Sequence, residues 1–247
     1  MCKFSGFIQF PFIIGIPLIL LMGFGPMSPL RAYDVIPVIH GGEISGTIKF
    51  KGEPPTNLSF QVMNNPEFCG STVRGETFII NPENKGIQNV VIRIEDIGRG
   101  KKPPSPTLVI ENRHCHFIPH VQSGMVGDLY EIKNSDPVLH NTHLHLDEST
   151  LMNVAMPPNG KNVKKMVMQK GLINVKCDAH KFMQGWILIS DNPYSAVSDQ
   201  DGKYTISDIP PGKYKITIWH EGIFSQEKEV TISPDKKINL SMDLTLN

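Results

Sequence analysis

The stretch Cys177-Asp178-Ala179-His180-Lys181-Phe182-Met183 decides how this chain is interpreted. It places a thiolate, an imidazole and a thioether at regular intervals of three residues. These soft and borderline donors suit copper rather than magnesium or calcium. A blue-copper site takes two His and one Cys in a near-trigonal plane, with a weak axial Met. The stretch supplies Cys177, His180 and Met183, and we expect His140 to supply the second imidazole.

Other matching segments surround this loop in a fixed order. They are Phe117-Ile118-Pro119, Val126-Gly127-Asp128, the run from Asn134 to His140-Asn141, and the loop Cys177–Met183 followed by Gln184-Gly185. Over about residues 108–190 the chain therefore resembles the cupredoxins, most closely the amicyanin-like type. Ala179 and Lys181 stand where that type carries prolines, and Leu139 replaces the usual proline before the first His. These departures change loop stiffness but leave the set of ligands intact.

The resemblance implies a function and a set of roles. His140, Cys177, His180 and Met183 would bind copper, with Asn141 tying the two ligand loops together and Asn134 opening the first of them. We therefore expect the protein to transfer single electrons and to have no catalytic activity. In cupredoxins the loop histidine is the usual electron port, so a redox protein partner (a cytochrome or a copper or other redox enzyme) would dock near His180, on an apolar surface.

The rest of the chain is typical of an all-β protein. Short segments rich in β-branched and aromatic residues recur between Gly, Pro, Asn and Asp. Ile44–Ile48, the turn Asp199–Gly202 and the turn Pro210–Tyr214 resemble the carboxypeptidase regulatory-like domain, a transthyretin-like β-sandwich. The resemblance covers roughly residues 41–98 and 195–247.

We therefore expect a cupredoxin Greek-key β-sandwich and a second, smaller transthyretin-like β-sandwich. The expected order is a signal peptide at 1–32, the first part of the small sandwich at 33–103, the cupredoxin domain at 104–191, and the second part at 192–247. The alternative is one continuous, elaborated β-domain.

The N-terminus indicates export. Lys3 precedes a short apolar run interrupted by Pro11 and Pro17, and Ala32 is a plausible cleavage residue. We expect a secretory signal peptide and a periplasmic or otherwise exported protein without a stable membrane span; an uncleaved anchor is the alternative. Loss of Lys3 and Arg31 leaves two more acidic than basic side chains. This balance does not predict nucleic-acid binding.

The four cysteines can be assigned to three places in the chain. Cys2 lies in the signal segment and Cys177 in the metal motif, so Cys69 and Cys115 remain. In an oxidising compartment two remaining cysteines most simply form a disulfide bond. Two buried free thiols are the alternative.

Four further histidines are candidates for the ligands of a second metal site. His114 and His116 would share one face of a strand, as would His143 and His145. These four side chains are candidates for a second metal site, against the plainer alternative of polar strand residues facing solvent. The His143–Asp147 segment is also similar to the start of the zinc-hydrolase motif, but Glu148 stands where another His is needed.

Rival functions use the same residues differently. A copper carrier or sensor would exchange the metal instead of cycling its oxidation state. A structural β-sandwich module would keep a vestigial copper site.

Overall fold

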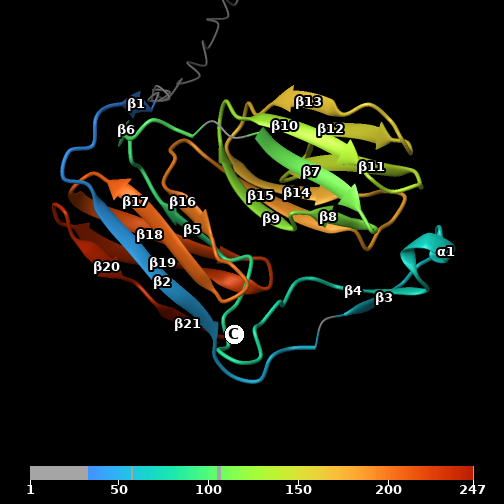
Figure 1. Ribbon diagram of the computed structural model, residues 1–247, viewed down its shortest axis with the longest axis horizontal. Helices are drawn as coiled ribbons and strands as arrows, with labels where there is room; N and C mark the ends of the chain where they lie inside the picture. The colour runs from blue at the N-terminus through green and yellow to red at the C-terminus, as the bar shows by residue number, and fades with distance from the viewer. Residues whose placement is uncertain (1–32, 57, 105–106, 247) are drawn as a thin grey trace, which may run out of the picture. The chain divides into compact units, whose positions relative to one another are not determined.

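The computed structural model describes residues 33–56, 58–104 and 107–246. The predicted signal peptide, residues 1–32, lies outside the described residues. The described chain is almost entirely β-structure arranged as two sandwiches, which confirms the expected fold class (Figure 1). None of the helices in this part of the chain is long and apolar enough to cross a membrane.

The central sandwich contains two sheets. The first has the order β13-β10-β7-β8, with bounds Val163–Met166, Leu129–Asn134, Thr107–Arg113 and His116–Ile118. The second has the order β12-β11-β14-β15-β9, with bounds Ser149–Met156, His140–Leu146, Gly171–Lys176, Gln184–Ser190 and Val121–Met125. Strand β7 runs parallel to β10, and β9 runs parallel to β15.

Alternation of side chains produces the core of this sandwich. Buried and half-buried residues alternate along β7 and at the start of β11, as the two-residue period of a strand requires. Ile110, Ile132, Leu144 and Ile173 meet in one buried cluster. Cys177 and Met183 belong to the same cluster, so the candidate metal ligands lie at the end of a packed core.

The second sandwich is built from strands far apart in the sequence. One sheet has the order β16-β5-β18-β19, with bounds Ser195–Val197, Val91–Ile94, Gly212–His220 and Ile223–Ile232. The other has the order β17-β2-β20, with β21 also pairing β2, and bounds Lys203–Ile209, Gly42–Phe50, Lys237–Asn239 and Met242–Leu244. In Figure 1 the blue strand β2 lies beside the orange strand β17, with which it pairs antiparallel. Ile44 and Ile92 pack with Ile216 in its core.

A turn at Asp199–Gly202 leads into β17. The Asp199 side chain accepts hydrogen bonds from the backbone N–H groups of Asp201 and Lys203, at 2.9 and 2.8 Å. Gly202 has a φ of 76°, and a Cβ there would lie 2.2 Å from the carbonyl oxygen of Ile48. Glycine is therefore required by both the backbone conformation and the close approach.

One segment belongs to neither sandwich. Residues 58–75, which we call the arm, contain β3 (Ser59–Gln61), the single helical turn α1 (Pro66–Cys69) and β4 (Thr72–Arg74). β3 and β4 pair antiparallel, and the Gly75 N–H closes the arm on the Leu58 carbonyl oxygen at 2.7 Å. The remaining pair, β1 (Asp34–Val35) with β6 (Arg99–Gly100), is parallel.

Candidate metal centre

Three candidate ligands converge at one end of the central sandwich. His140 is the first residue of β11, and Cys177 directly follows β14, the neighbouring strand. His180 lies in the turn after Cys177. The Sγ atom of Cys177 is 3.9 Å from Nδ1 of His140 and 3.8 Å from Nδ1 of His180. The three ligand atoms lie within 4.8 Å of one another, and all three residues are buried.

These spacings fit a trigonal metal site. Metal bonds of about 2.3 Å to sulfur and 2.0 Å to nitrogen, set about 120° apart, would separate the sulfur and nitrogen atoms by about 3.7 Å. The observed separations of 3.9 and 3.8 Å agree with that value. The residues present therefore fit a soft first-row metal ion.

The loop that carries the other ligands closes on itself. The N–H of Met183 donates to the His180 carbonyl oxygen at 2.8 Å, and the Cys177 N–H donates to the Met183 carbonyl oxygen at 3.4 Å. The Met183 side chain is buried in the same cluster as Cys177. Its role as the axial ligand stays a prediction from the sequence.

Asn141 connects the two ligand loops. Its Oδ1 atom accepts from the backbone N–H groups of Asp178 at 2.6 Å and of Ala179 at 3.3 Å. Its own backbone N–H donates to the Cys177 sulfur at 3.5 Å, and its side-chain amide donates to Asn153 and Asp178. Hydrogen bonds of this kind orient a ligand and tune the metal that it holds.

Asn134 organises the loop before His140. Its side-chain amide donates to the carbonyl oxygens of Val138 and Met156, at 2.9 and 2.8 Å. Its Oδ1 atom accepts from the backbone N–H of Asp136 at 3.0 Å. Asn134 thus acts on the backbone of the ligand loop.

The electrostatic environment favours neutral imidazoles. Burial lowers the pKa of His140, although the charge and hydrogen bond of Asp136 oppose this effect. Burial and the nearby His140 lower the pKa of His180. Burial raises the pKa of the Cys177 thiol, against the backbone hydrogen bonds that it receives. Two neutral imidazoles are ready to bind a metal, whereas the thiol must release its proton on binding.

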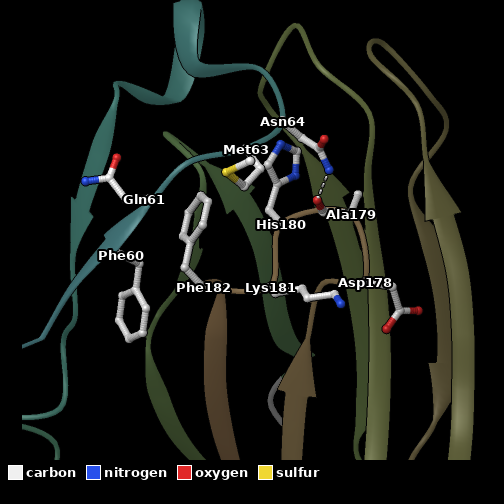
Figure 2. Close-up of a pocket in the computed structure, with 9 residues that line it drawn as sticks. All are labelled: Phe60, Gln61, Met63, Asn64, Asp178, Ala179, His180, Lys181 and Phe182. Atoms are coloured by element: carbon white, nitrogen blue, oxygen red, sulfur yellow. Dashed lines mark hydrogen bonds between the residues drawn. The ribbon is translucent and has the colours of Figure 1, made fainter.

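The arm covers the edge of His180, and this corrects one expectation. We expected the ring edge of His180 to reach an apolar surface, as in the cupredoxins, but the residue is only 2% exposed. Figure 2 shows Met63 and Asn64 of the arm beside the ring, with the Asn64 amide donating to the Ala179 carbonyl oxygen at 2.6 Å. The physical reason is an arm held over the loop, which the sequence did not reveal.

A pocket of about 390 Å³ separates part of the arm from the ligand loop. It is lined from the arm by Phe60, Gln61, Met63 and Asn64, and from the loop by Asp178, Ala179, His180, Lys181 and Phe182. The Met63 side chain at its margin is 85% exposed. The Phe182 ring contacts His180 edge-on, with centroids 5.8 Å apart.

The predicted disulfide bond is present and anchors the arm. Cys69 in α1 is bonded to Cys115 in the turn between β7 and β8, with Cα atoms 5.6 Å apart. Cys177 is the free cysteine of the described residues, and it is buried.

The four additional histidines do not form a metal group. Within the described ranges, the groups with suitable spacing are His140–Cys177–His180 and Cys115–Asp136–His140. Cys115 in the second group is used by the disulfide bond. The rings of His143 and His145 stack with centroids 3.7 Å apart, and His143 contacts Asp178 and Thr150. His114 and His116 lie at the β7–β8 turn, apart from that pair.

Sequence reasoning missed Asp136. Its carboxylate lies 2.8 Å from Nε2 of His140, the ring nitrogen that faces away from Cys177. An aspartate four residues before a histidine in a loop carries no signal of its own. Only the fold of the loop brings the two side chains together.

The central two-sheet sandwich carries a buried His-Cys-His group at one end, and the chain adds a second β-sandwich to it. For that second sandwich, residues 187–246 match the family model of the carboxypeptidase regulatory-like domain. The match begins within β15, a few residues before the boundary expected from the sequence.

Solved structures similar to this chain include copper proteins. The reduced state of an amicyanin mutant has 18% identity and a TM-score of 0.31, covering 40% of this chain and 98% of its own. A purple cupredoxin from Nitrosopumilus maritimus has 19% identity and a TM-score of 0.30, covering 34% of this chain and 99% of its own.

A copper-containing nitrite reductase from Thermus scotoductus SA-01 has 19% identity and a TM-score of 0.30, covering 34% of this chain. Only 22% of that enzyme's own chain is matched. No curated protein matches the chain.

Proposed function

We propose that this protein is an exported type 1 copper protein that transfers single electrons. The observation that carries the proposal is the buried group of His140, Cys177 and His180, with sulfur-to-nitrogen distances of 3.9 and 3.8 Å. Copper bound there would supply a centre that gains and loses one electron. Cys177 would supply a thiolate ligand, His140 and His180 would supply imidazole ligands, and Met183 would supply a thioether ligand.

Rigidity of the site supports electron transfer. Asn141 bonds to both ligand loops, and Asn134 braces the loop before His140. Ligands that are held in place before the metal binds change position little when the metal changes oxidation state. A small change in geometry lowers the cost of each electron transfer.

Burial of the ligands weighs against the carrier alternative. His140 is 0% exposed, and Cys177 and His180 are each 2% exposed. A copper carrier or sensor must pass its metal to a partner by ligand exchange, which requires ligands that the partner can reach. The buried arrangement favours a resident metal ion.

A redox protein partner and an exported location complete the proposal. The Cys69–Cys115 disulfide bond is typical of an oxidising compartment such as the periplasm. Because the arm covers His180, we place partner docking at the pocket margin, where Phe182 approaches the His180 ring. No substrate chemistry is proposed for the protein.

Spectroscopy of the purified protein after Cu(II) addition tests the proposal. We expect an intense visible band, compressed copper hyperfine splitting in the EPR spectrum and a reversible voltammetric wave. Cys177→Ser should abolish all three, while Ser135→Ala, outside the ligand set, should retain them. A pale, ordinary Cu(II) spectrum from the unaltered protein would reject the type 1 centre. Rapid copper loss without a reversible wave would instead support a carrier.

A further inference from the structure

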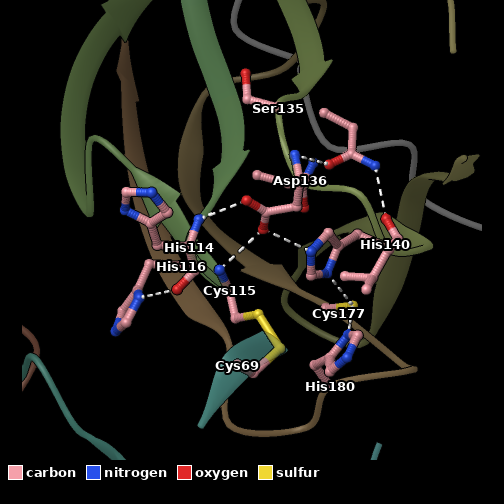
Figure 3. A network of polar contacts seen from close by, with 12 residues as sticks. Cys69, His114, Cys115, His116, Ser135, Asp136, His140, Cys177 and His180 are labelled. Atoms are coloured by element: carbon pink, nitrogen blue, oxygen red, sulfur yellow. Dashed lines mark hydrogen bonds and ion pairs between the residues drawn. A yellow bond between two sulfur atoms is a disulfide. The ribbon is translucent and has the colours of Figure 1, made fainter. Parts of the chain in front are cut away.

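A buried carboxylate lies directly behind one of the proposed ligands. Asp136 occupies the loop between β10 and β11, and its side chain is only 1% exposed. Its Oδ2 atom is 2.8 Å from Nε2 of His140 (Figure 3). The opposite nitrogen of the same ring, Nδ1, is the one that faces the Cys177 sulfur.

The remaining contacts of the Asp136 carboxylate come from backbone N–H groups. Its Oδ1 atom accepts from the His114 N–H at 2.6 Å, and its Oδ2 atom accepts from the Cys115 N–H at 2.9 Å. Figure 3 shows these bonds meeting at one carboxyl group. Both backbone groups are donors, so the carboxyl oxygens of Asp136 act as acceptors toward the turn.

The donors are held by an unusual hairpin turn. Arg113 pairs with His116, which leaves His114 and Cys115 as a two-residue loop. Both have positive φ angles, 51° and 58°, as a type I′ turn requires. Asn and Gly are the residues that usually take these positions, and His and Cys take them at a cost. Strained positions of this kind persist where the surrounding structure fixes them, often near functional sites.

Two features fix this turn. Cys115 is bonded to Cys69 of the arm, and the turn's N–H groups are bonded to Asp136. The same carboxylate therefore connects the disulfide-bonded turn to the His140 ring. Cys115 itself offers no metal ligand, because its sulfur is in the disulfide bond.

We propose that Asp136 is a positioning residue that selects the ring tautomer of His140 and tunes the metal bound by it. A protonated Nε2 donates a hydrogen bond to the carboxylate, which leaves the Nδ1 lone pair directed at the site. Its negative charge also strengthens the ring as a donor and stabilises Cu(II) relative to Cu(I). The tuning half of this inference rests on the proposed copper function, whereas the tautomer does not.

The first measurement uses the unaltered, metal-free protein. Long-range ¹H–¹⁵N NMR of the histidine rings should show His140 with a proton on Nε2 and none on Nδ1. A proton on Nδ1 instead would overturn the inference. This measurement requires neither copper nor a variant that folds.

The second measurement compares two buried aspartates. Asp136→Asn should raise the reduction potential and weaken copper binding by roughly 10- to 100-fold. The matched control is Asp128→Asn, because Asp128 is also buried but its carboxylate accepts from the Met125 N–H, at 2.7 Å, in the turn before β10. A purely structural Asp136 would leave the potential of the folded variant equal to that of the control, which would overturn the tuning role.

The two proposals fail in different ways. Absence of a type 1 spectrum in the unaltered protein would reject the copper function, with the NMR result for His140 still standing. A normal type 1 spectrum together with an unchanged potential in Asp136→Asn would reject only the role of Asp136.

Discussion

The side-chain amide of Asn64 donates a hydrogen bond of 2.6 Å to the carbonyl oxygen of Ala179, across 115 residues of sequence. Ala179 immediately precedes His180, so this bond holds the arm against the ligand loop. A second tie, the Cys69–Cys115 disulfide bond, holds the arm to the β7–β8 turn. Arm and central sandwich are thus joined at two places around the candidate metal centre.

Loss of the Asn64 bond should make the centre more accessible. Removing one such hydrogen bond costs roughly 1 kcal/mol, which corresponds to about a fivefold larger population of the open arm. We expect Asn64→Ala to release copper to a chelator about fivefold faster, measured by stopped-flow absorbance. Asn65→Ala is the control, since the Asn65 side chain donates to the exposed Glu67 of the arm itself. Equal release rates in the two variants would show that the arm does not control access.

Loss of the disulfide bond should destabilise the fold. Cys69 and Cys115 are 46 residues apart in sequence, a loop whose closure contributes roughly 4 kcal/mol in the chain-entropy model. The double variant Cys69→Ala/Cys115→Ala should lower the free energy of unfolding by an amount approaching that value, measured by urea denaturation. Comparison with the unaltered protein under reducing conditions separates the missing bond from the substituted side chains. An unchanged midpoint would contradict the expected role of the bond.

Stability should fall at alkaline pH because of a buried ion pair. His120 is 7% exposed at its side chain and lies 2.5 Å from Glu221, with Glu76 3.5 Å from its other nitrogen. Burial alone would lower the pKa of His120, but the bonds and charges of Glu221 and Glu76 raise it to about 9. A raised histidine pKa stabilises the fold fully below about 6.5, and this contribution is lost as pH rises through about 9.

Urea denaturation between about pH 6 and pH 10 measures this loss. Burial would raise the pKa of Glu221, but the hydrogen bond and charge of His120 lower it. The stability that the Glu221 carboxylate contributes is therefore lost only at acidic pH. Glu221→Gln keeps a hydrogen-bond acceptor for Trp186 while removing the charge. The variant should be less stable near neutral pH and should show a flatter profile between about pH 6.5 and 9. An equally steep profile in both proteins would assign the alkaline loss to other groups.

His220 should produce the opposite dependence of stability on pH, with a loss of stability in acid. Burial lowers the pKa of His220 to about 4, against the opposing effects of the Glu221 charge and the Thr77 backbone. A depressed histidine pKa means that the unfolded chain binds the proton first, so stability falls as pH drops from about 6.5 towards 4. His220→Gln should reduce this acid sensitivity between about pH 6.5 and 5. Thermal denaturation over that range provides the measurement, and an unchanged slope would contradict the assignment.

The axial role of Met183 can be tested electrochemically. Removing a weak thioether donor should destabilise Cu(II) and raise the reduction potential, whereas a harder oxygen donor should lower it. Met183→Leu and Met183→Gln are therefore expected to shift the potential in opposite directions. Met152 is a control methionine on β12, outside the ligand loops. Potentials that shift alike in both Met183 variants would remove Met183 from the ligand set.

Much of the candidate site is local in sequence, and that part was predictable. Cys177 and His180 sit three residues apart, so any turn after a strand places them near each other. The pairing of His140 with them followed from a resemblance, because no local rule connects His140 with Cys177, 37 positions further along the chain. The covered edge of His180 and the contact of Asp136 with His140 were not predictable. Both depend on loops whose positions are set by distant partners.

The amino-acid sequence by itself determined the β-structure, the set of soft candidate donors and the cysteine pair, because side-chain period, donor chemistry and the count of thiols do not depend on the fold. Tertiary structure decided the rest. It paired β2 with β17, laid the arm over His180 and turned the His114–Cys115 hairpin onto Asp136. The physical reason is that hydrogen bonds and packing between distant segments form only when the whole chain has folded, and their geometry is not written in any one stretch of sequence.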